Sequence, residues 1–255
     1  MDTFEELVSA AEREPFQGWN FAYIRGRYEQ AQPSWNYHEL VLERLGRATS
    51  LLDLGTGGGE FLSSLGRLPP TACATEGYPP NTKVALANLR SRGVSIVQTF
   101  CEDEWRMHRR GALPFRTESF DLVIDRHESY IPEEVLRVLK KTGQFVTQQV
   151  GERNNAELRQ LFGVSERTPA WNLARATDEL DATGFRVLAR GESIARSRFL
   201  DVGAVVYLLK AVPWDFPDFS TSRFEKELRE IHSVILQKGS FDVTTARFYL
   251  VASKD

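Results

Sequence analysis

The sequence of 255 residues contains little cysteine and no long apolar run. Its two cysteines, Cys73 and Cys101, are too few for a disulfide framework or a metal cluster, and both lie in apolar stretches. We therefore expect buried free thiols in a reducing compartment and no bound metal. No stretch approaches the roughly 20 apolar residues that a membrane-spanning helix needs. Residues 1–6 are acidic and lack the apolar core of a signal peptide. These absences predict a soluble, cytoplasmic protein that does not use a membrane.

Neither sign of charge is in excess, since 32 Lys and Arg residues face 35 Asp and Glu residues and give a net charge of -3. Proteins with general affinity for nucleic acid usually have a basic domain, so nucleic acid is not an expected partner. The apolar fraction of 42% suffices for the core of one large α/β domain, or of one domain with a small cap. These totals leave the oligomeric state open.

A glycine-rich turn is the main local feature of the sequence, at residues 51–61 (LLDLGTGGGEF). An apolar run is followed by a turn and then by a helical pattern, as in the first half of a βαβ unit. Glycine at Gly55 and Gly57 allows backbone angles that other residues avoid and lets a ligand lie directly on the main chain. The dinucleotide pattern G-x-G-x-x-G fails at Glu60. Asp53 instead suits a ligand with a cationic amino group and little phosphate, and a purely structural turn is the alternative.

Short apolar runs and amphipathic segments alternate along the rest of the chain. Strands are predicted at residues 50–54, 72–75, 94–99, 119–125, 145–150, 185–189 (or to 194) and 244–252. Helices are predicted at residues 2–13, 34–45, 61–68, 81–90, 133–140, 155–162, 173–183 and 224–236, with Gly143 capping the helix at 133–140. Residues 201–211 fit a strand or a buried helix, and their length and the following Pro213 favour the helix. This alternation predicts an α/β fold with a Rossmann-like, doubly wound, mostly parallel sheet.

Polar residues follow the predicted strands, and in such sheets ligands bind beyond the carboxyl ends of the strands. Glu76 ends the second predicted strand, roughly 20 residues after the glycine turn, where a carboxylate can accept both hydroxyl hydrogens of a ribose. Asp103, residues 125–128 and residues 148–149 follow later strands. We expect these groups to converge on one rim with Asp53.

The N-terminal residues 1–47 precede this pattern, and residues 16–23 among them are unusually aromatic (FQGWNFAY). One interpretation is a segment that wraps the core. The other is a lid over the cofactor and substrate.

Several motifs together resemble one family. The D-x-G-x-G-x-G turn beginning at Asp53 is similar to motif I of the class I S-adenosylmethionine (SAM) methyltransferases. The strand beginning Phe-Asp-Leu-Val at 120 and the stretch Glu134–Gly143, similar to E-x-x-R-V-L-K-P-G-G, resemble the methyltransferase type 11 group over roughly residues 48–150. Lys141 and Thr142 replace the usual Pro and Gly, which affects only a turn.

The resemblance implies a seven-stranded sheet with the last strand antiparallel, in a SAM-binding domain at residues 48–255. Residues 195–240, between the sixth and seventh strands, are expected to form an inserted cap over the substrate. One acid in the loop after the third strand would bind the adenine amino group by analogy with this family. The candidate cofactor-binding residues are Asp53, Gly55, Thr56, Gly57, Glu76, Gly77, Glu102, Asp103 and Arg126.

The candidate catalytic residues, His127 and Glu128, follow the fourth strand, where the family has residues next to the transferred methyl group. A base is needed when the acceptor must lose a proton. His127 titrates near neutral pH and suits this role, with Glu128 orienting it or acting alone. Arg126 could also hold an acidic substrate. For His127 the alternative is a purely structural, hydrogen-bonded histidine.

The sequence thus predicts an enzyme that transfers methyl from SAM to an O, N or C nucleophile of a small molecule. An RNA-base methyltransferase is one alternative, with basic clusters at residues 106–110 and 196–198. A scaffold that binds SAM without catalysis is another.

Overall fold

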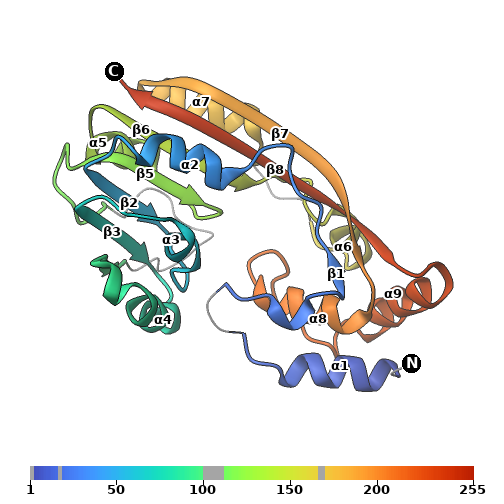
Figure 1. The fold of residues 1–255 in the computed structure, drawn as a ribbon. Helices are drawn as coiled ribbons and strands as arrows, with labels where there is room; N and C mark the ends of the chain where they lie inside the picture. Colours follow the sequence, from blue (N-terminus) through green and yellow to red (C-terminus); the bar gives the residue numbers. More distant parts are fainter. Residues whose placement is uncertain (1–2, 17–18, 100–111, 166–169) are drawn as a thin grey trace.

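The computed structural model describes residues 3–16, 19–99, 112–165 and 170–255, and in this part of the chain eight strands form a single sheet (Figure 1). The sheet order is β1-β7-β8-β6-β5-β2-β3-β4. The strands are β1 (Tyr28–Glu29), β2 (Ser50–Leu54), β3 (Thr71–Glu76), β4 (Ser95–Gln98), β5 (Phe120–Arg126), β6 (Leu139–Val150), β7 (Phe185–Phe199) and β8 (Phe241–Lys254).

Strands β2 to β6 run parallel to one another, whereas β8 is antiparallel to both β6 and β7. This arrangement confirms the mostly parallel, doubly wound sheet with an antiparallel last strand. All seven predicted strands are present. The two-residue strand β1 adds an eighth, because residues 28–29 pair antiparallel with the end of β7.

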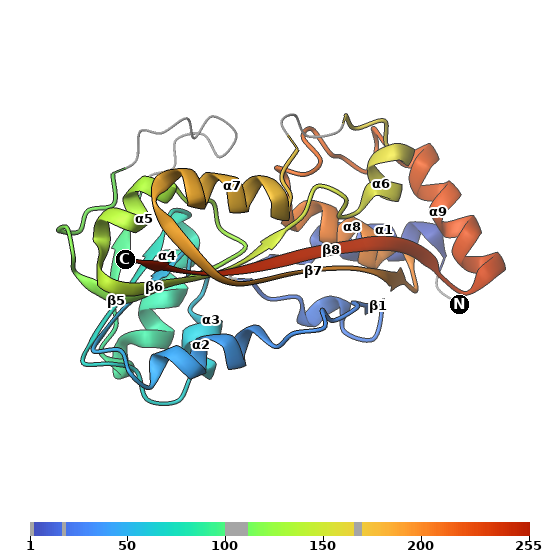
Figure 2. The same ribbon diagram turned by 90° about the horizontal axis from the view of Figure 1, so that it is seen from above.

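Helices cover both faces of the sheet, as Figure 2 shows. On one face lie α2 (Tyr37–Leu45), α3 (Glu60–Ser64) and α4 (Pro79–Leu89), and on the other lie α5 (Pro132–Val138) and α7 (Leu173–Thr183). Successive strand residues point to opposite faces. In β2, Leu51 therefore packs with the α2 face and Leu52 with the α5 face, and both are fully buried. The α2 helix begins later than the sequence suggested, because Asn36 caps it by accepting from the N–H of His38.

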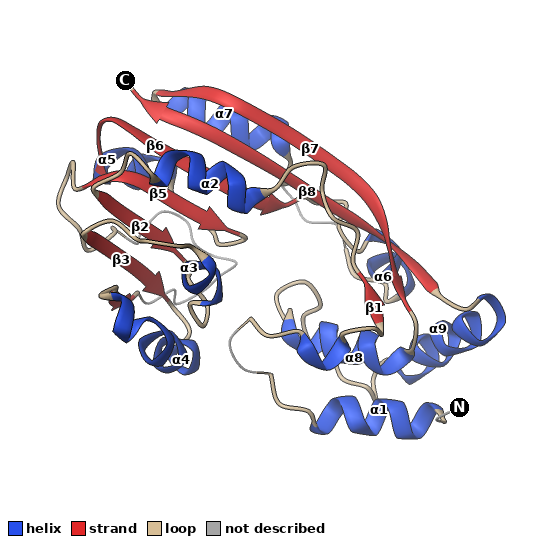
Figure 3. Ribbon diagram, in the orientation of Figure 1, coloured by secondary structure: helices blue, strands red, loops and turns tan. Residues whose placement is uncertain are grey.

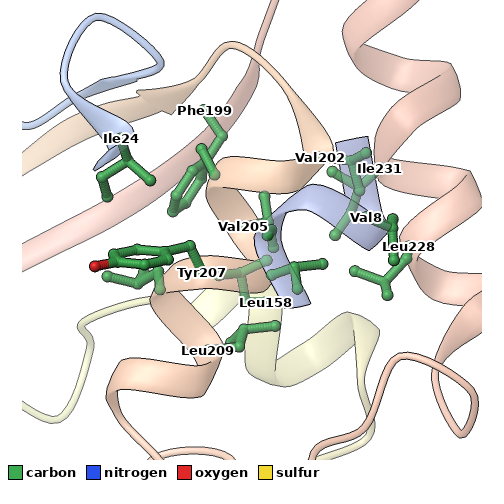
Figure 4. Packing of buried hydrophobic residues seen from close by; sticks show 14 of the residues in the cluster. Val8, Ile24, Leu158, Phe199, Val202, Val205, Tyr207, Leu209, Leu228 and Ile231 are labelled. Carbon is green, nitrogen blue, oxygen red and sulfur yellow. The ribbon is translucent and has the colours of Figure 1, made fainter. Parts of the chain in front are cut away.

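A second, helical lobe lies beyond the glycine-turn end of the sheet (Figure 3). It contains α1 (Phe4–Arg13), α6 (Ala156–Leu161), α8 (Val202–Ala211) and α9 (Glu225–Lys238), packed with the distal ends of β7 and β8. Figure 4 shows its core, in which Val205 of α8 lies among side chains from the other elements. Residues 201–211 are therefore a buried helix. In the sequence, the helices α8 and α9 come after β7 and before β8. The strand β7 itself continues to Phe199, beyond the expected start of the inserted cap at residue 195.

The predicted helix at residues 133–140 is confirmed up to Val138, but its last two residues and its Gly143 cap are wrong. The α5 helix ends at Val138, Leu139 is already extended, and Gly143 lies inside β6. Leu139 pairs with Phe120, and the register then shifts so that Leu122 pairs with Gln144. Pairing with β5 thus draws the backbone into the sheet before the turn that the sequence places at Gly143.

Within residues 3–16, 19–99, 112–165 and 170–255, no helix is both long and apolar enough to cross a membrane. Cys73 is a free, partly buried thiol, and Cys101 lies outside the described residues.

Candidate active site

The glycine turn connects β2 to α3 and requires glycine at its first position. Gly55 and Gly57 have φ angles of 62° and 61°, in the left-handed region that favours glycine. A Cβ atom added to Gly55 would lie only 2.6 Å from the Cβ of Glu128, so the side chain of Glu128 lies directly against the turn. The turn therefore places bare backbone against the residues that follow β5.

Two polar side chains at this turn each have one buried oxygen atom without a hydrogen-bond partner. Within the described part of the chain, neither Oδ2 of Asp53 nor Oγ1 of Thr56 has one. Asp53 is 3% exposed, and its burial raises the pKa of its carboxyl group to about 7. Glu76 and Glu128 add to the rise, and Arg126 opposes it. A buried carboxylate with an unused oxygen is costly in isolation, so this site is suited to a cationic ligand.

Glu76 lies at the carboxyl end of β3 and is also buried. Its Oε1 accepts from the backbone N–H of Tyr78 at 2.8 Å. Burial raises the pKa of Glu76, and the backbone N–H groups of Tyr78, Gly57 and Gly77 limit the rise. The structure thus brings Glu76 and Gly77 together with Gly57. Glu102 and Asp103, predicted for the same site, lie outside the described residues.

Asp125 is a further buried acid at the end of β5. One of its oxygens, Oδ1, accepts from the amide of Gln149 at 2.8 Å and from the backbone of Glu128 at 3.3 Å. The other, Oδ2, has no partner among the described residues. Burial and the charge of Glu128 raise the pKa of Asp125 well above its usual range. Gln149 also donates to the carbonyl of Glu128, so it holds the loop after β5.

The state of the His127 ring follows from its hydrogen bonds. The indole N–H of Trp35 donates to Oε1 of Gln148 at 2.8 Å, and an indole can only donate. The amide nitrogen of Gln148 therefore faces Nε2 of His127, at 3.0 Å, and Nε2 must accept. The ring is neutral with its proton on Nδ1. Burial lowers the pKa of His127 well below its usual value, and the charges of Arg247 and Arg126 act in the same direction.

Arg126 is exposed, and its guanidinium lies over the ring of Phe61, 5.5 Å from the ring centroid. Its charge acts on Asp53, His127 and Arg247, which places it at the junction of the glycine turn and the loop after β5.

The aromatic N-terminal segment lies against the glycine turn. The backbone N–H of Trp19 approaches Oε1 of Glu60 at 3.4 Å, and the Trp19 side chain is 3.5 Å from where a Cβ of Gly57 would be. The ring of Trp19 stacks on Trp214, which follows α8, with centroids 6.0 Å apart. The segment thus joins the helical lobe to the turn.

Sequence reasoning missed several residues of this site. Trp35, Tyr37 and Arg247 come from distant parts of the chain, and no motif includes them. The Tyr37 hydroxyl lies 2.8 Å from the carbonyl of Asp125 and 3.2 Å from that of Val146, between two parallel strands. For Arg247 the sequence offers one indication, a charge inside the apolar pattern of the last strand.

Comparison with known proteins identifies the sheet and its turn. Residues 52–147, which include the glycine turn, β3 and β5, match the family described as "Methyltransferase domain". This part of the chain is a class I methyltransferase domain of type 11. Its cofactor is therefore S-adenosylmethionine, and the enzyme is a SAM-dependent methyltransferase. No curated protein matches the chain.

Solved structures similar to this methyltransferase show that it shares their fold. Protein BH2331 of Bacillus halodurans is 18% identical with a TM-score of 0.59, and the match covers 86% of this chain and 98% of that one. The YcgJ protein of Bacillus subtilis is 14% identical with a TM-score of 0.54, over 86% and 97% of the two chains. A functionally unknown protein of Deinococcus radiodurans is 13% identical with a TM-score of 0.55, over 89% of each.

The residues of this methyltransferase fit its cofactor. SAM carries positive charge on its sulfur and on its amino group. Buried carboxyl groups with an unused oxygen are present at Asp53, before the turn, and at Asp125, near the end of β5. The bare backbone at Gly55 and Gly57 gives a ligand access to the main chain. In the described part of the chain, no cluster of His, Cys, Asp and Glu could hold a metal ion.

Proposed function

We propose that this methyltransferase acts on an oxygen, nitrogen or carbon nucleophile of a small molecule. The observation that carries the proposal is the position of Trp19, which lies on the glycine turn and stacks on Trp214 of the helical lobe. Aromatic walls beside a few polar groups are typical of small-molecule sites. An RNA duplex or protein surface would need an open approach to this turn.

In this proposal the cofactor is held by the acids and glycines of the rim. Asp53 binds the amino group of the cofactor and Glu76 binds the ribose hydroxyls, with Glu102 or Asp103 accepting from the adenine. Gly55, Thr56, Gly57 and Gly77 supply backbone or hydroxyl contacts, and Arg126 borders the same space. When bound, the cofactor supplies a methyl group activated by a positively charged sulfur. The protein then has mainly to align the acceptor, which alone can supply much of the rate.

Glu128 and His127 are the residues proposed to act on the acceptor. The side chain of Glu128 lies against Gly55, and as a carboxylate it can take a proton from a hydroxyl or an ammonium group. The neutral ring of His127, with its Nε2 accepting from Gln148, has a proton to donate at Nδ1. We therefore propose that Glu128 is the base and that His127 holds the acceptor by donating a hydrogen bond.

The RNA alternative has little support from the described surface. In the basic cluster at residues 196–198, Arg196 pairs with Glu157 and Arg198 with Asp242. Residues 106–110 lie outside the described part.

An acceptor screen tests the proposal. Purified protein with SAM is offered pools of phenols, amines and carboxylic acids, and separately total RNA, while S-adenosylhomocysteine is measured. We expect product with one small-molecule pool and none with RNA. Product with RNA alone, lost as salt concentration rises, would overturn the proposal.

A further inference from the structure

Arg247 lies on β8 beside the carboxyl end of β6. Val150, the last residue of β6, is paired with Arg247, and Gln148 is paired with both Arg126 and Tyr249. Residues paired across a sheet share a face, and alternate residues do so along a strand. Arg126, Gln148 and Arg247 are therefore on one face of the sheet, at the rim where ligands bind in this class of fold. In Figure 1 this end of β6 lies against the middle of β8.

The guanidinium of Arg247 is held in place by neutral groups. Its Nη1 donates to Oδ1 of Asn154 at 2.6 Å and to the carbonyl of Ala246 at 2.8 Å. Asn154 is buried, and its Oδ1 also receives the N–H of Ala246. One edge of the guanidinium is thus fixed, whereas Nε and Nη2 have no hydrogen-bond partner in the described part of the chain.

No acid compensates the charge of Arg247 among the described residues. Burial lowers the pKa of Arg247 to about 10; the nearby Tyr28 hydroxyl opposes this fall, and the charge of Arg126 adds to it. Arg126 likewise has no ion pair among the described residues, and its guanidinium lies over the Phe61 ring. Arg27, by contrast, forms a two-point bond with Asp201, as expected for an arginine that stabilises the fold.

The site thus has two poles of opposite charge. Asp53, Glu76 and Asp125 form the acidic pole at the glycine turn, and Arg126 and Arg247 form the basic pole beside the loop that follows β5. His127 is near both arginines and is neutral, so it does not compensate either pole. A cationic cofactor at the acidic pole leaves the basic pole to the acceptor.

We propose that Arg247 binds an anionic group of the methyl acceptor, a carboxylate or a phosphate, through its Nε and Nη2. The proposal rests on the proposed function, because it assigns a substrate class to the same site. A planar guanidinium presents two parallel N–H groups to such an oxyanion, which gives both affinity and orientation. Arg126 adds a second positive charge that favours the same ligand. The acceptor is then a small anionic molecule whose nucleophile lies toward Glu128.

Anion binding to the protein saturated with S-adenosylhomocysteine tests this without needing the true acceptor. Inorganic phosphate and acetate are the probes, titrated at constant ionic strength, and binding is followed by the shift in the thermal unfolding midpoint. We expect one of them to bind at millimolar concentration and Arg247→Gln to weaken it about tenfold. A preference for phosphate indicates a phosphorylated acceptor, and one for acetate indicates a carboxylic acid.

Arg190→Gln is the matched control, because Arg190 is exposed and lies on the opposite face of the neighbouring strand β7. It makes the same charge change and should leave anion binding unaltered. Equal weakening in both variants, or no anion binding by the wild type, would overturn the proposal. Binding of S-adenosylhomocysteine is measured first, so failure of the cofactor site is seen separately.

A second measurement does not depend on the folding of a variant. Wild-type protein is treated with phenylglyoxal, which modifies arginine, and the modified peptides are mapped by mass spectrometry. The bound probe should slow modification of Arg247 several-fold and leave Arg190 unaffected. Equal rates at Arg247 with and without the probe would contradict the proposal.

Discussion

At the scale of single residues, the acids of the rim are arranged for binding at the expense of stability. Asp53 is buried with an unused oxygen, and its carboxyl group is more easily protonated than in an unfolded chain. A cationic ligand would reverse this, since an opposite charge favours the ionised form. The same residue therefore affects both the pH dependence of folding and the affinity for the cofactor.

Asp53→Asn should flatten the pH dependence of stability. The folded pKa of about 7 lies above the ordinary value of about 4, so between these pH values the folded state binds more protons than the unfolded state. Stability then falls as pH rises through this window, by up to about 4 kcal/mol at 1.36 kcal/mol for each unit of pKa. Urea unfolding at pH 5 and pH 8 should show a smaller difference for Asp53→Asn than for the wild type. Asp178→Asn, at an exposed position of α7, is the control, and a wild-type pH dependence in Asp53→Asn would refute the assignment.

Glu76→Ala should weaken binding of SAM and S-adenosylhomocysteine at least tenfold, a loss of about 1.4 kcal/mol. The buried carboxylate at the end of β3 is the group proposed to accept both ribose hydroxyls. Calorimetric titration measures the change, with NAD as a ligand that should not bind. Glu133→Ala, at an exposed position of α5, should have no effect. Unchanged affinity in folded Glu76→Ala would contradict the ribose assignment.

Glu128 and His127 should affect turnover rather than cofactor binding. Once an acceptor is known, Glu128→Gln should lower kcat by at least a hundredfold if it is the base, since general bases contribute typically 10²–10⁴-fold. His127→Ala should lower turnover less and leave the affinity for S-adenosylhomocysteine nearly intact. The pH profile of kcat distinguishes the two roles. Removing the base should abolish the fall in kcat at acidic pH, whereas removing a hydrogen-bond donor should leave that fall in place. Unchanged turnover in His127→Ala would make this histidine structural.

At the scale of elements, the segment around Trp19 connects the helical lobe to the glycine turn. Its contacts are aromatic: Trp19 stacks on Trp214, and Phe16 and Phe21 pack edge-on against Trp19. Trp19 remains 40% exposed, whereas Phe16 and Phe21 of the same segment pack against the core of the helical lobe. The segment thus has features of both interpretations, and a lid over the turn stays a prediction that rests on Trp19.

Trp19→Ala should speed release of S-adenosylhomocysteine by about three- to tenfold, because an aromatic pair contributes about 0.5–1.5 kcal/mol. Trp214→Ala removes the same stack from the other side and is expected to have a similar effect. The change in dissociation free energy of the double variant should then be smaller than the sum of the changes in the two single variants, as for residues in contact. Stopped-flow measurement of dissociation provides the test, and unchanged rates in both single variants would exclude the lid.

At the scale of the whole molecule, the long strands β7 and β8 join the two lobes into one unit. They pair from Phe185 to Phe199 along almost their whole length and contribute to the cores of both the sheet and the helical lobe. Phe199, at the end of β7, is fully buried in the helical lobe and stacks on Tyr28 of β1. We therefore expect the two lobes to unfold together.

Phe199→Ala should lower the free energy of unfolding by about 3–5 kcal/mol, the usual cost of truncating a buried phenylalanine. If the lobes are one cooperative unit, far-UV circular dichroism and tryptophan fluorescence should report the same shifted transition. Leu236→Ala, at a position 57% exposed, should change stability by less than about 0.5 kcal/mol. Two separate transitions in Phe199→Ala would show that the lobes unfold independently.

Much of the fold and part of the site of this protein could be predicted from local patterns in its sequence. Alternating apolar runs and amphipathic segments predicted the strands, and strand-end acids predicted the rim, because parallel strands present their carboxyl ends on one edge. The structure brings Asp53, Gly55, Gly57 and Glu76 together in this way. These features depend on residues close in the chain, or on a repeated pattern, so one sequence suffices to find them.

Other features depend on contacts between distant segments, and only the tertiary structure decided them. Gly143 lies inside β6, in the irregular stretch where the register of β6 on β5 shifts, and does not cap a helix. The neutral state of His127 follows from Trp35 through Gln148, and the place of Arg247 follows from the register of β8 on β6. Hydrogen bonds, burial and charge pairing between residues far apart in sequence leave no local pattern. The sequence therefore determined which kind of enzyme this is, whereas the assembled rim decided the ionisation of its groups and where an anionic acceptor can bind.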